Sequence, residues 1–280
     1  MNAPVEGSIF DNAWLALREP VDHASRAHGL SQLAGRALAA RSAPKVVDLG
    51  TGSGSNLRYL SAYLPTETRW RLIDHDADLL ARVAAHAGHA GHAVSPHVTT
   101  ETRDLARELC PAIGGADLIT ASALLDLVSD AWLDTLCRSA AAQRSAVLFA
   151  LSVDGRIRLT GRTDTDDRAL LSALAVDQRR DKGLGAALGT AAPAHLINHL
   201  AARGYGVTAM PAIWYLDTRQ PELVAALLDG WAAAACTARP AEARRFKSWA
   251  ARRTADITAG RSGLEVGHID VLGLPGRRTP

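Results

Sequence analysis

A short apolar segment that ends in an acid and runs into three alternating glycines constrains this chain more than any other feature. Residues 46–54 read VVDLGTGSG, and a helix-like stretch begins at Ser55. A strand, a tight glycine turn and a helix start bring bare backbone close to a nucleotide-like ligand, because glycine tolerates positive φ and the first helical N–H groups are free. The dinucleotide fingerprint G-x-G-x-x-G places its third glycine one residue later, so the spacing here favours a different ligand.

Acids and polar residues follow at the ends of three further expected strands. Residues 69–74 end at Asp74, about 20 residues past the glycines, the offset at which an acid meets ribose hydroxyls in α/β nucleotide folds. Residues 98–102 precede Asp104 and Leu105, and residues 117–122 end at Ser122. Because parallel strands present their carboxyl ends at one edge, we expect these side chains to share one crevice.

In order and in spacing, these segments resemble class I S-adenosylmethionine (SAM)-dependent methyltransferases. The resemblance is carried by residues 44–152 and continues over residues 195–275. It implies SAM as the cofactor and S-adenosyl-L-homocysteine (SAH) as the product, with the glycine turn under the methionine part. The cofactor-binding residues implied by the resemblance are Asp48, Gly50, Gly52, Gly54, Asp74, His75, Asp104, Leu105 and Ser122.

Some of these residues also have a purely structural interpretation. Asp74 is suited to cap the helix that begins near His75, and Asp76 competes for that role. Asp104 could equally cap a helix, and Leu105 could belong to the core. These alternatives stay open at the level of the sequence.

The alternation of strands and helices after residue 44 predicts an α/β fold. We expect a seven-stranded, mostly parallel, doubly wound sheet of the methyltransferase type, with strand 7 antiparallel. Residues 1–43 are expected to form an N-terminal helical arm, in which Pro20 ends or kinks the first helix. Residues 44–280 form the SAM-binding domain, with helical insertions at about 154–190 and 217–263 that we interpret as a substrate lid.

The substrate side offers less specific signals. Asp126, after the fourth strand, and Asp181, in the first insertion, are the candidate catalytic residues. The candidate substrate-binding residues are Trp14, Arg18, Asp177, Lys182 and Trp214. The alternatives are that Trp14 is core, that Arg18 lies at a solvated helix end, that Asp126 caps a helix and that residues 177–182 form a solvated loop.

The sequence therefore predicts a methyltransferase of class EC 2.1.1 that acts on an O or N atom of a small molecule. An RNA-directed methyltransferase stays open because basic residues recur over 244–253, and so does an NAD(P)-dependent oxidoreductase using the same crevice. A binding subunit with this fold but without activity is a further alternative. The Asn/Asp-Pro-Pro-aromatic tetrad of nucleobase amino-group methyltransferases is absent after the fourth strand.

Composition narrows the partners and the compartment. The net charge of +2 favours neither nucleic acid nor an anionic membrane, and three scattered cysteines fit a reducing compartment. We expect a cytoplasmic bacterial protein without a signal peptide or a membrane partner, whose oligomeric state is open, a homodimer being one option. The histidines at 86, 89, 92 and 97 are interpreted as an exposed loop, and no metal is expected.

Overall fold

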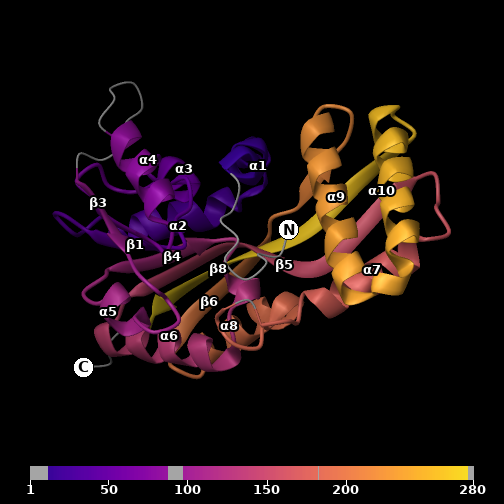
Figure 1. The fold of residues 1–280 in the computed structure, drawn as a ribbon. Helices are drawn as coiled ribbons and strands as arrows, with labels where there is room; N and C mark the ends of the chain where they lie inside the picture. The colour runs from indigo at the N-terminus through magenta and orange to yellow at the C-terminus, as the bar shows by residue number, and fades with distance from the viewer. Residues whose placement is uncertain (1–11, 88–96, 182, 277–280) are drawn as a thin grey trace.

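The computed structural model describes residues 12–87, 97–181 and 183–276 as an α/β structure built on one mixed sheet (Figure 1). Over these residues the sheet has eight strands in the order β3-β2-β1-β4-β5-β8-β6, and β7 pairs with β8. Strands β1 to β5 run parallel to one another, whereas β8 is antiparallel to β5, β6 and β7. The strands are β1 (Lys45–Leu49), β2 (Arg69–Asp74), β3 (Val98–Thr102), β4 (Leu118–Ser122), β5 (Ala146–Gly161), β6 (Tyr205–Pro211), β7 (Trp214–Leu216) and β8 (Ser262–Pro275).

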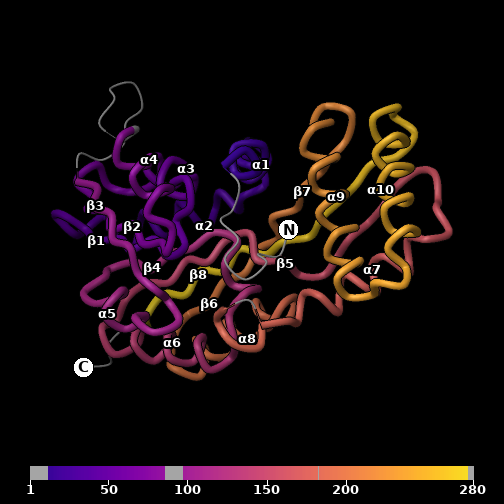
Figure 2. Tube along the Cα trace, in the orientation of Figure 1, coloured from indigo at the N-terminus to yellow at the C-terminus, as the bar shows by residue number. Residues whose placement is uncertain are grey.

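The predicted fold class is confirmed, with the strand count corrected from seven to eight. The extra strand is β7, three residues long, which Figure 2 shows beside the start of the helix α9 (Pro221–Ala238). It exists because β8 begins at Ser262, within the expected insertion 217–263, and offers Leu264–Val266 as a pairing edge. Strand β5 likewise continues to Gly161, so the chain leaves the sheet later than the expected residue 154.

Helices cover both faces of the sheet. Helices α2 (His28–Leu38), α3 (Ser55–Leu60) and α4 (Ala77–Ala87) pack on the face that carries Val46. Helices α5 (Leu109–Ile113), α6 (Asp130–Gln143) and α8 (Ala192–Ala201) pack on the face that carries Val47. Because β1 and β4 are buried on both faces, consecutive residues such as Val46–Val47 and Leu118–Ile119 are apolar rather than alternating with polar ones.

A third core lies where β5 and β8 extend beyond the parallel strands. Helices α7 (Asp167–Asp177), α9 and α10 (Ala243–Thr258) pack around these extensions and form the helical lobe seen on the right of Figure 1. Helix α1 (Asn12–Ser25) also contributes to this core through Trp14. In the described residues no helix is long and apolar enough to cross a membrane.

Pro20 was expected to end or kink the first helix, and the structure shows that it does not end it. Pro20 lies inside α1, and the helix continues to Ser25. Proline removes one backbone hydrogen bond but adopts helical φ, and the ion pair of Arg18 with Asp22 spans the same turn. The break falls instead at Arg26–Ala27, because the Ala27 N–H and the Arg26 Nε both donate to the Asp270 carboxylate.

Candidate active site

The glycine turn between β1 and α3 adopts a backbone that other residues rarely take. The three glycines have φ values of +62°, +53° and +81° for Gly50, Gly52 and Gly54. A Cβ built on Gly54 would come within 3.1 Å of Val83, and one on Gly52 would lie 3.4 Å from Leu15 of α1. Glycine is therefore required by conformation at all three positions, and α1 lies directly on Gly52.

Asp48, at the end of β1, holds this turn through side-chain hydrogen bonds. Its fully buried carboxylate accepts hydrogen bonds from Thr51 Oγ1 at 2.7 Å and from Asn56 Nδ2 at 2.6 Å. Burial raises the pKa of Asp48 to about 6, against the lowering effect of these two donors. The strand-end acid thus holds the turn to the first residues of α3.

A buried polar network continues from Asn56 through Arg26 to Asp270 of β8. Arg26 donates from Nη1 to Asn56 Oδ1 at 2.9 Å and from Nε to Asp270 Oδ2 at 3.2 Å. The guanidinium also lies 4.3 Å from the ring centroid of Tyr59. The other oxygen of Asp270 accepts from the Leu151 N–H at 2.8 Å, where Leu151 has a strained φ of +52°. Arg26, Asn56 and Asp270 were not predicted from the sequence, although Asp270 stands out as an acid among apolar residues.

Asp74 contacts the glycine turn directly. Its Oδ2 accepts from the Gly52 N–H at 2.8 Å, and its Oδ1 accepts from the Asp76 N–H and lies 3.1 Å from His75 Nδ1. Burial works to raise the pKa of Asp74, but the bonds from His75, Gly52 and Asp76 outweigh it and hold the pKa below its usual range. The bond to Asp74 in turn raises the pKa of His75. Asp76 rather than Asp74 caps the helix α4, because Asp76 Oδ1 accepts from the N–H of Leu79 at 3.1 Å.

The remaining cofactor candidates, Asp104, Leu105 and Ser122, differ in exposure. Asp104 is exposed, and its Oδ1 accepts from the Ala106 N–H at 2.9 Å, so it closes a local turn. Leu105 is buried, and its carbonyl accepts from Trp132 Nε1 at 2.8 Å. Ser122 is partly exposed at the end of β4, immediately before Ala123, whose φ of +55° marks a strained turn at the same edge of the sheet.

Helix α1 is fastened to the glycine turn by polar contacts. Glu19 accepts from Arg58 Nε at 2.7 Å, and Arg58 Nη1 donates to the Ser53 carbonyl at 2.7 Å. His23 Nε2 lies 3.0 Å from Ser55 Oγ. Together with Leu15 over Gly52, these contacts make α1 a cover on the turn.

Three of the candidate substrate residues are brought together by α1 and β7. The Arg18 guanidinium lies 5.9 Å from the ring centroid of Trp14 and 5.2 Å from that of Trp214. All three side chains are buried, so Arg18 does not lie at a solvated helix end. Both indole N–H groups are without a hydrogen-bond partner among the described residues. The His268 ring packs 5.1 Å from Trp214, and burial followed by the charge of Arg18 lowers the pKa of His268 to about 3.

The remaining candidates lie around the loops that follow β4 and α7. Asp126 is buried in the short 3₁₀ helix Leu125–Leu127, and Asp177 is buried at the end of α7 within 3.1 Å of Arg180 Nη1. Asp181 is exposed, and its Oδ1 accepts from the N–H groups of Gly183 and Gly185. Lys182 lies outside the described residues.

The two loops touch through backbone hydrogen bonds. The Ser129 N–H donates to the Leu184 carbonyl at 3.1 Å, and the Leu188 N–H donates to the Val128 carbonyl at 2.9 Å. The first insertion therefore packs on the segment that follows Asp126. The structure does not place Asp181 in contact with the Trp14–Arg18–Trp214 group over the described residues.

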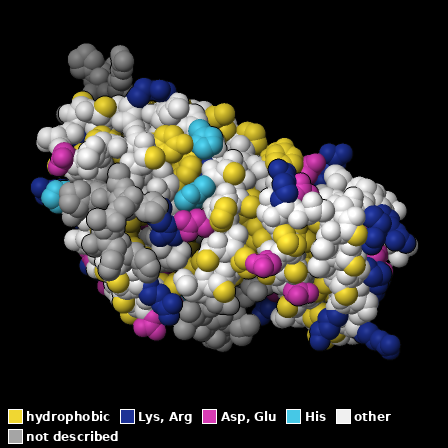
Figure 3. Space-filling model, turned by 90° about the horizontal axis from the view of Figure 1, so that it is seen from above, with side chains coloured by type: hydrophobic (Ala, Val, Ile, Leu, Met, Phe, Trp, Pro, Cys, Tyr) yellow, Lys and Arg dark blue, Asp and Glu magenta, His cyan; other side chains and the backbone are white. Residues whose placement is uncertain are grey.

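A groove runs along another side of α1. It has a volume of about 930 Å³ and is lined by apolar residues of α1 and of the β7–α9 segment, including Leu17, Pro20, Tyr215 and Leu223. Figure 3 shows hydrophobic side chains gathered in the middle of the face seen from above, between the sheet and the helical lobe. The groove therefore borders α1, the same helix that covers the glycine turn.

No family model and no curated protein matches the sequence. Among solved structures, the cyclopropane synthase MmaA2 from Mycobacterium tuberculosis is similar with a TM-score of 0.51, at 12% identity over 94% of each chain. A SAM-dependent methyltransferase from Geobacter sulfurreducens in complex with SAH aligns with a TM-score of 0.47, at 16% identity over 93% of this chain and 97% of its own. This chain thus shares its fold with that cyclopropane synthase, and its sheet fits the methyltransferase-type Rossmann-like fold that the sequence predicts.

Proposed function

We propose that this protein is a SAM-dependent methyltransferase of class EC 2.1.1 that methylates an O or N atom of a small molecule. The observation that carries the proposal is the Gly52–Asp74 contact, in which the glycine turn and the ribose-position acid are fixed against each other at 2.8 Å. SAM is the cofactor that we assign to the crevice, because the glycine turn and Asp74 stand where the resemblance places the methionine part and the ribose.

The residues present fit this cofactor. The pKa of Asp74 is held below its usual range, so it is a carboxylate at neutral pH. Its Oδ1 already accepts from the Asp76 N–H and faces His75 Nδ1, whereas Oδ2 accepts from the Gly52 N–H and retains a lone pair that can accept from a ribose hydroxyl. Gly52 has no side chain, so the space between the turn and Leu15 of α1 is not filled by a Cβ. Gly50, Gly54, Asp48, Asp104, Leu105 and Ser122 complete the proposed cofactor set.

When bound, SAM supplies a methyl group that its sulfonium charge has already activated. The chain itself then needs mainly to orient the acceptor and exclude water, which are the roles we assign to α1 and its contacts. We propose that Trp14, Arg18 and Trp214 form the acceptor side. Over the described residues both indole N–H groups lack a hydrogen-bond partner. The Arg18 guanidinium already donates to Asp22 from Nε and Nη2 but adds a positive charge, so the group favours an acceptor that carries oxygen atoms.

The ion pairs of α10 argue against the RNA-directed alternative. Figure 3 shows Lys and Arg side chains at the edge of the molecule near α9 and α10. Three arginines of α10 are paired with the acidic stretch 164–167: Arg245 with Asp166, Arg252 with Asp164 and Arg253 with Asp167. Arg253 is moreover fully buried, so this basic run is largely committed to internal contacts.

The arrangement of the lobes supports the remaining proposals. We assign residues 1–43 to an arm that covers the cofactor and residues 154–190 and 217–263 to the substrate lid of the domain 44–280. We also propose that the protein acts in the cytoplasm. Its oligomeric state stays open between a monomer and a homodimer.

Calorimetry with SAH, SAM and NAD separates the cofactor alternatives. We expect SAH to bind at micromolar concentration and NAD to give no heat. Heat with NAD and none with SAH would replace the proposal by the oxidoreductase alternative. Binding of neither would leave the fold without its expected cofactor and would favour a binding subunit.

A further inference from the structure

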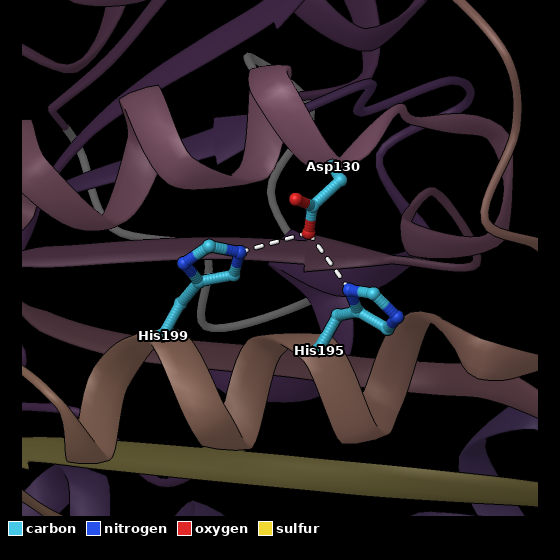
Figure 4. A group of neighbouring side chains, drawn as sticks. All are labelled: Asp130, His195 and His199. Carbon is cyan, nitrogen blue, oxygen red and sulfur yellow. Dashed lines mark hydrogen bonds and ion pairs between the residues drawn. The ribbon is translucent and has the colours of Figure 1, made fainter.

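A group of two histidines and an aspartate lies on the outer surface of the helices α6 and α8, remote in sequence from the glycine turn. His195 Nδ1 lies 2.7 Å and His199 Nε2 lies 2.8 Å from the same atom, Asp130 Oδ1. Figure 4 shows both imidazoles projecting from α8 toward the single carboxylate of α6. We propose that Asp130, His195 and His199 bind a divalent transition metal of the zinc type and thereby clip α6 to α8.

The positions of the two histidines suit chelation. Residues four apart lie on the same side of a helix, one turn above the other, so His195 and His199 present two imidazoles to one point. The ligand atoms of the three residues all lie within 4.8 Å of one another. A zinc ion with ligands at about 2.0–2.2 Å needs atoms about 3–3.5 Å apart, so a small rotation of the exposed Asp130 admits it.

The donor chemistry matches the same class of metal. Two imidazole nitrogens and one carboxylate oxygen form a ligand set that zinc accepts, with water in the fourth position. Hydrogen bonds between exposed groups contribute little by themselves, whereas a metal would join the helices through three bonds.

The surroundings also provide for the imidazole proton. Metal binding at His199 Nε2 requires the proton to reside on Nδ1, which lies 3.4 Å from Asp134 Oδ1 and also 3.4 Å from Arg203 Nη1. With the proton on Nδ1, Asp134 can accept a hydrogen bond from it and Arg203 Nη1 donates to the His199 carbonyl alone. A carboxylate that accepts from the second ring nitrogen of a metal-bound histidine orients its imidazole. Asp134 is itself held by an ion pair with Arg203, whose Nη1 donates to the His199 carbonyl at 2.8 Å.

Zinc titration of the full chain, after dialysis against a chelator, tests the site. We expect one equivalent to bind and the melting temperature to rise by a few degrees at saturating zinc, because a ligand that binds only the folded state stabilises it. Asp130→Asn and the double change His195→Ala with His199→Ala should each weaken binding at least tenfold. Circular dichroism would establish that these variants remain folded.

The matched control uses other imidazoles of the same chain. The histidines His86, His89 and His92 occur close together in the sequence, so a variant with all three changed to alanine reports adventitious binding. We expect this control to keep the zinc equivalent and the rise in melting temperature. Loss of binding in the control but not in the double variant would overturn the proposal, and so would absence of zinc binding by the parent chain. None of these outcomes depends on methyl transfer, so the metal site and the proposed function stand or fall separately.

Discussion

Arg26 and Asp270, which are 244 residues apart in sequence, form an ion pair of 3.2 Å in which each side chain is only 1% exposed. The pair joins the junction of α1 and α2 to β8. Through Asn56, Arg26 also reaches the acid beneath the glycine turn. A buried pair is costly to desolvate, so its contribution here is chiefly to position three segments relative to one another.

Removing one partner of this pair should be strongly destabilising. Arg26→Met leaves the Asp270 carboxylate buried without its cation, and we expect the free energy of unfolding to fall by about 3–5 kcal/mol. Urea denaturation measures the change. The control is Arg41→Met, which breaks the exposed 2.6 Å pair with Asp117 and should cost less than about 1 kcal/mol. Equal effects of the two changes would contradict the structural role of Arg26.

Asp74 should carry part of the cofactor affinity. Asp74→Ala removes the acceptor for the ribose hydroxyls and leaves the Gly52 N–H without its partner, so SAH binding should weaken by about 1–3 kcal/mol. Calorimetry measures the change. Asp78→Ala removes an exposed acid from the neighbouring helix and should leave the affinity unchanged. Unaltered SAH binding by Asp74→Ala would remove this residue from the cofactor site.

Gly52 should tolerate no side chain in the bound state. Its φ of +53° disfavours valine, and the new Cβ would approach Leu15 in the space between α1 and the turn. We therefore expect Gly52→Val to abolish SAH binding in a chain that circular dichroism shows to be folded. Gly183→Val is the matched control, because Gly183 also has positive φ but has open space around it. Normal binding by Gly52→Val would mean that the cofactor does not approach this turn.

The two acids assigned to catalysis can be tested without changing their size. We expect Asp126→Asn and Asp181→Asn each to lower turnover at least tenfold, with SAM affinity unchanged. Asparagine at 181 keeps an oxygen that accepts from Gly183 and Gly185, so its loop is preserved and a loss would report on charge alone. If both variants act at the parent rate on the identified acceptor, the search moves to Arg18 and its neighbours on α1.

Asp48 should make stability depend on pH in an unusual direction. Its pKa is about 6 in the folded chain against 3.8 for an ordinary aspartate, so between pH 4 and pH 6 the native state holds a proton that the unfolded chain has released. Stability should therefore fall as the pH rises through this window, by up to about 3 kcal/mol from this group. Asp48→Asn cannot titrate, and urea denaturation at pH 4 and pH 6.5 should show a flatter profile. Parallel profiles for the two chains would contradict the raised pKa.

How far the sequence predicts this molecule depends on how local each feature is. The glycine turn, Asp74 and the parallel strands were predicted because their signals lie within a few neighbouring residues. The network of Arg26 with Asp270 and the cluster of Asp130 with His195 were not, because each joins residues that only the folded chain brings together. The sequence did not predict that β5 continues from Asp154 to Gly161. These residues are mostly polar, and they pack against a helical lobe that no local sequence pattern predicts.

The long pairing of β5 with β8 has a consequence for ligand exchange. The paired strands run from the sheet into the helical lobe, from Val147–Gly273 to Gly161–Ser262, so the lobe cannot turn away from the sheet without breaking them. Helix α1, in contrast, is fastened to the glycine turn through Glu19, His23 and Leu15. Added salt screens charged contacts of this kind. We therefore expect added salt to shorten the residence time of the cofactor more than it weakens the equilibrium affinity for the cofactor.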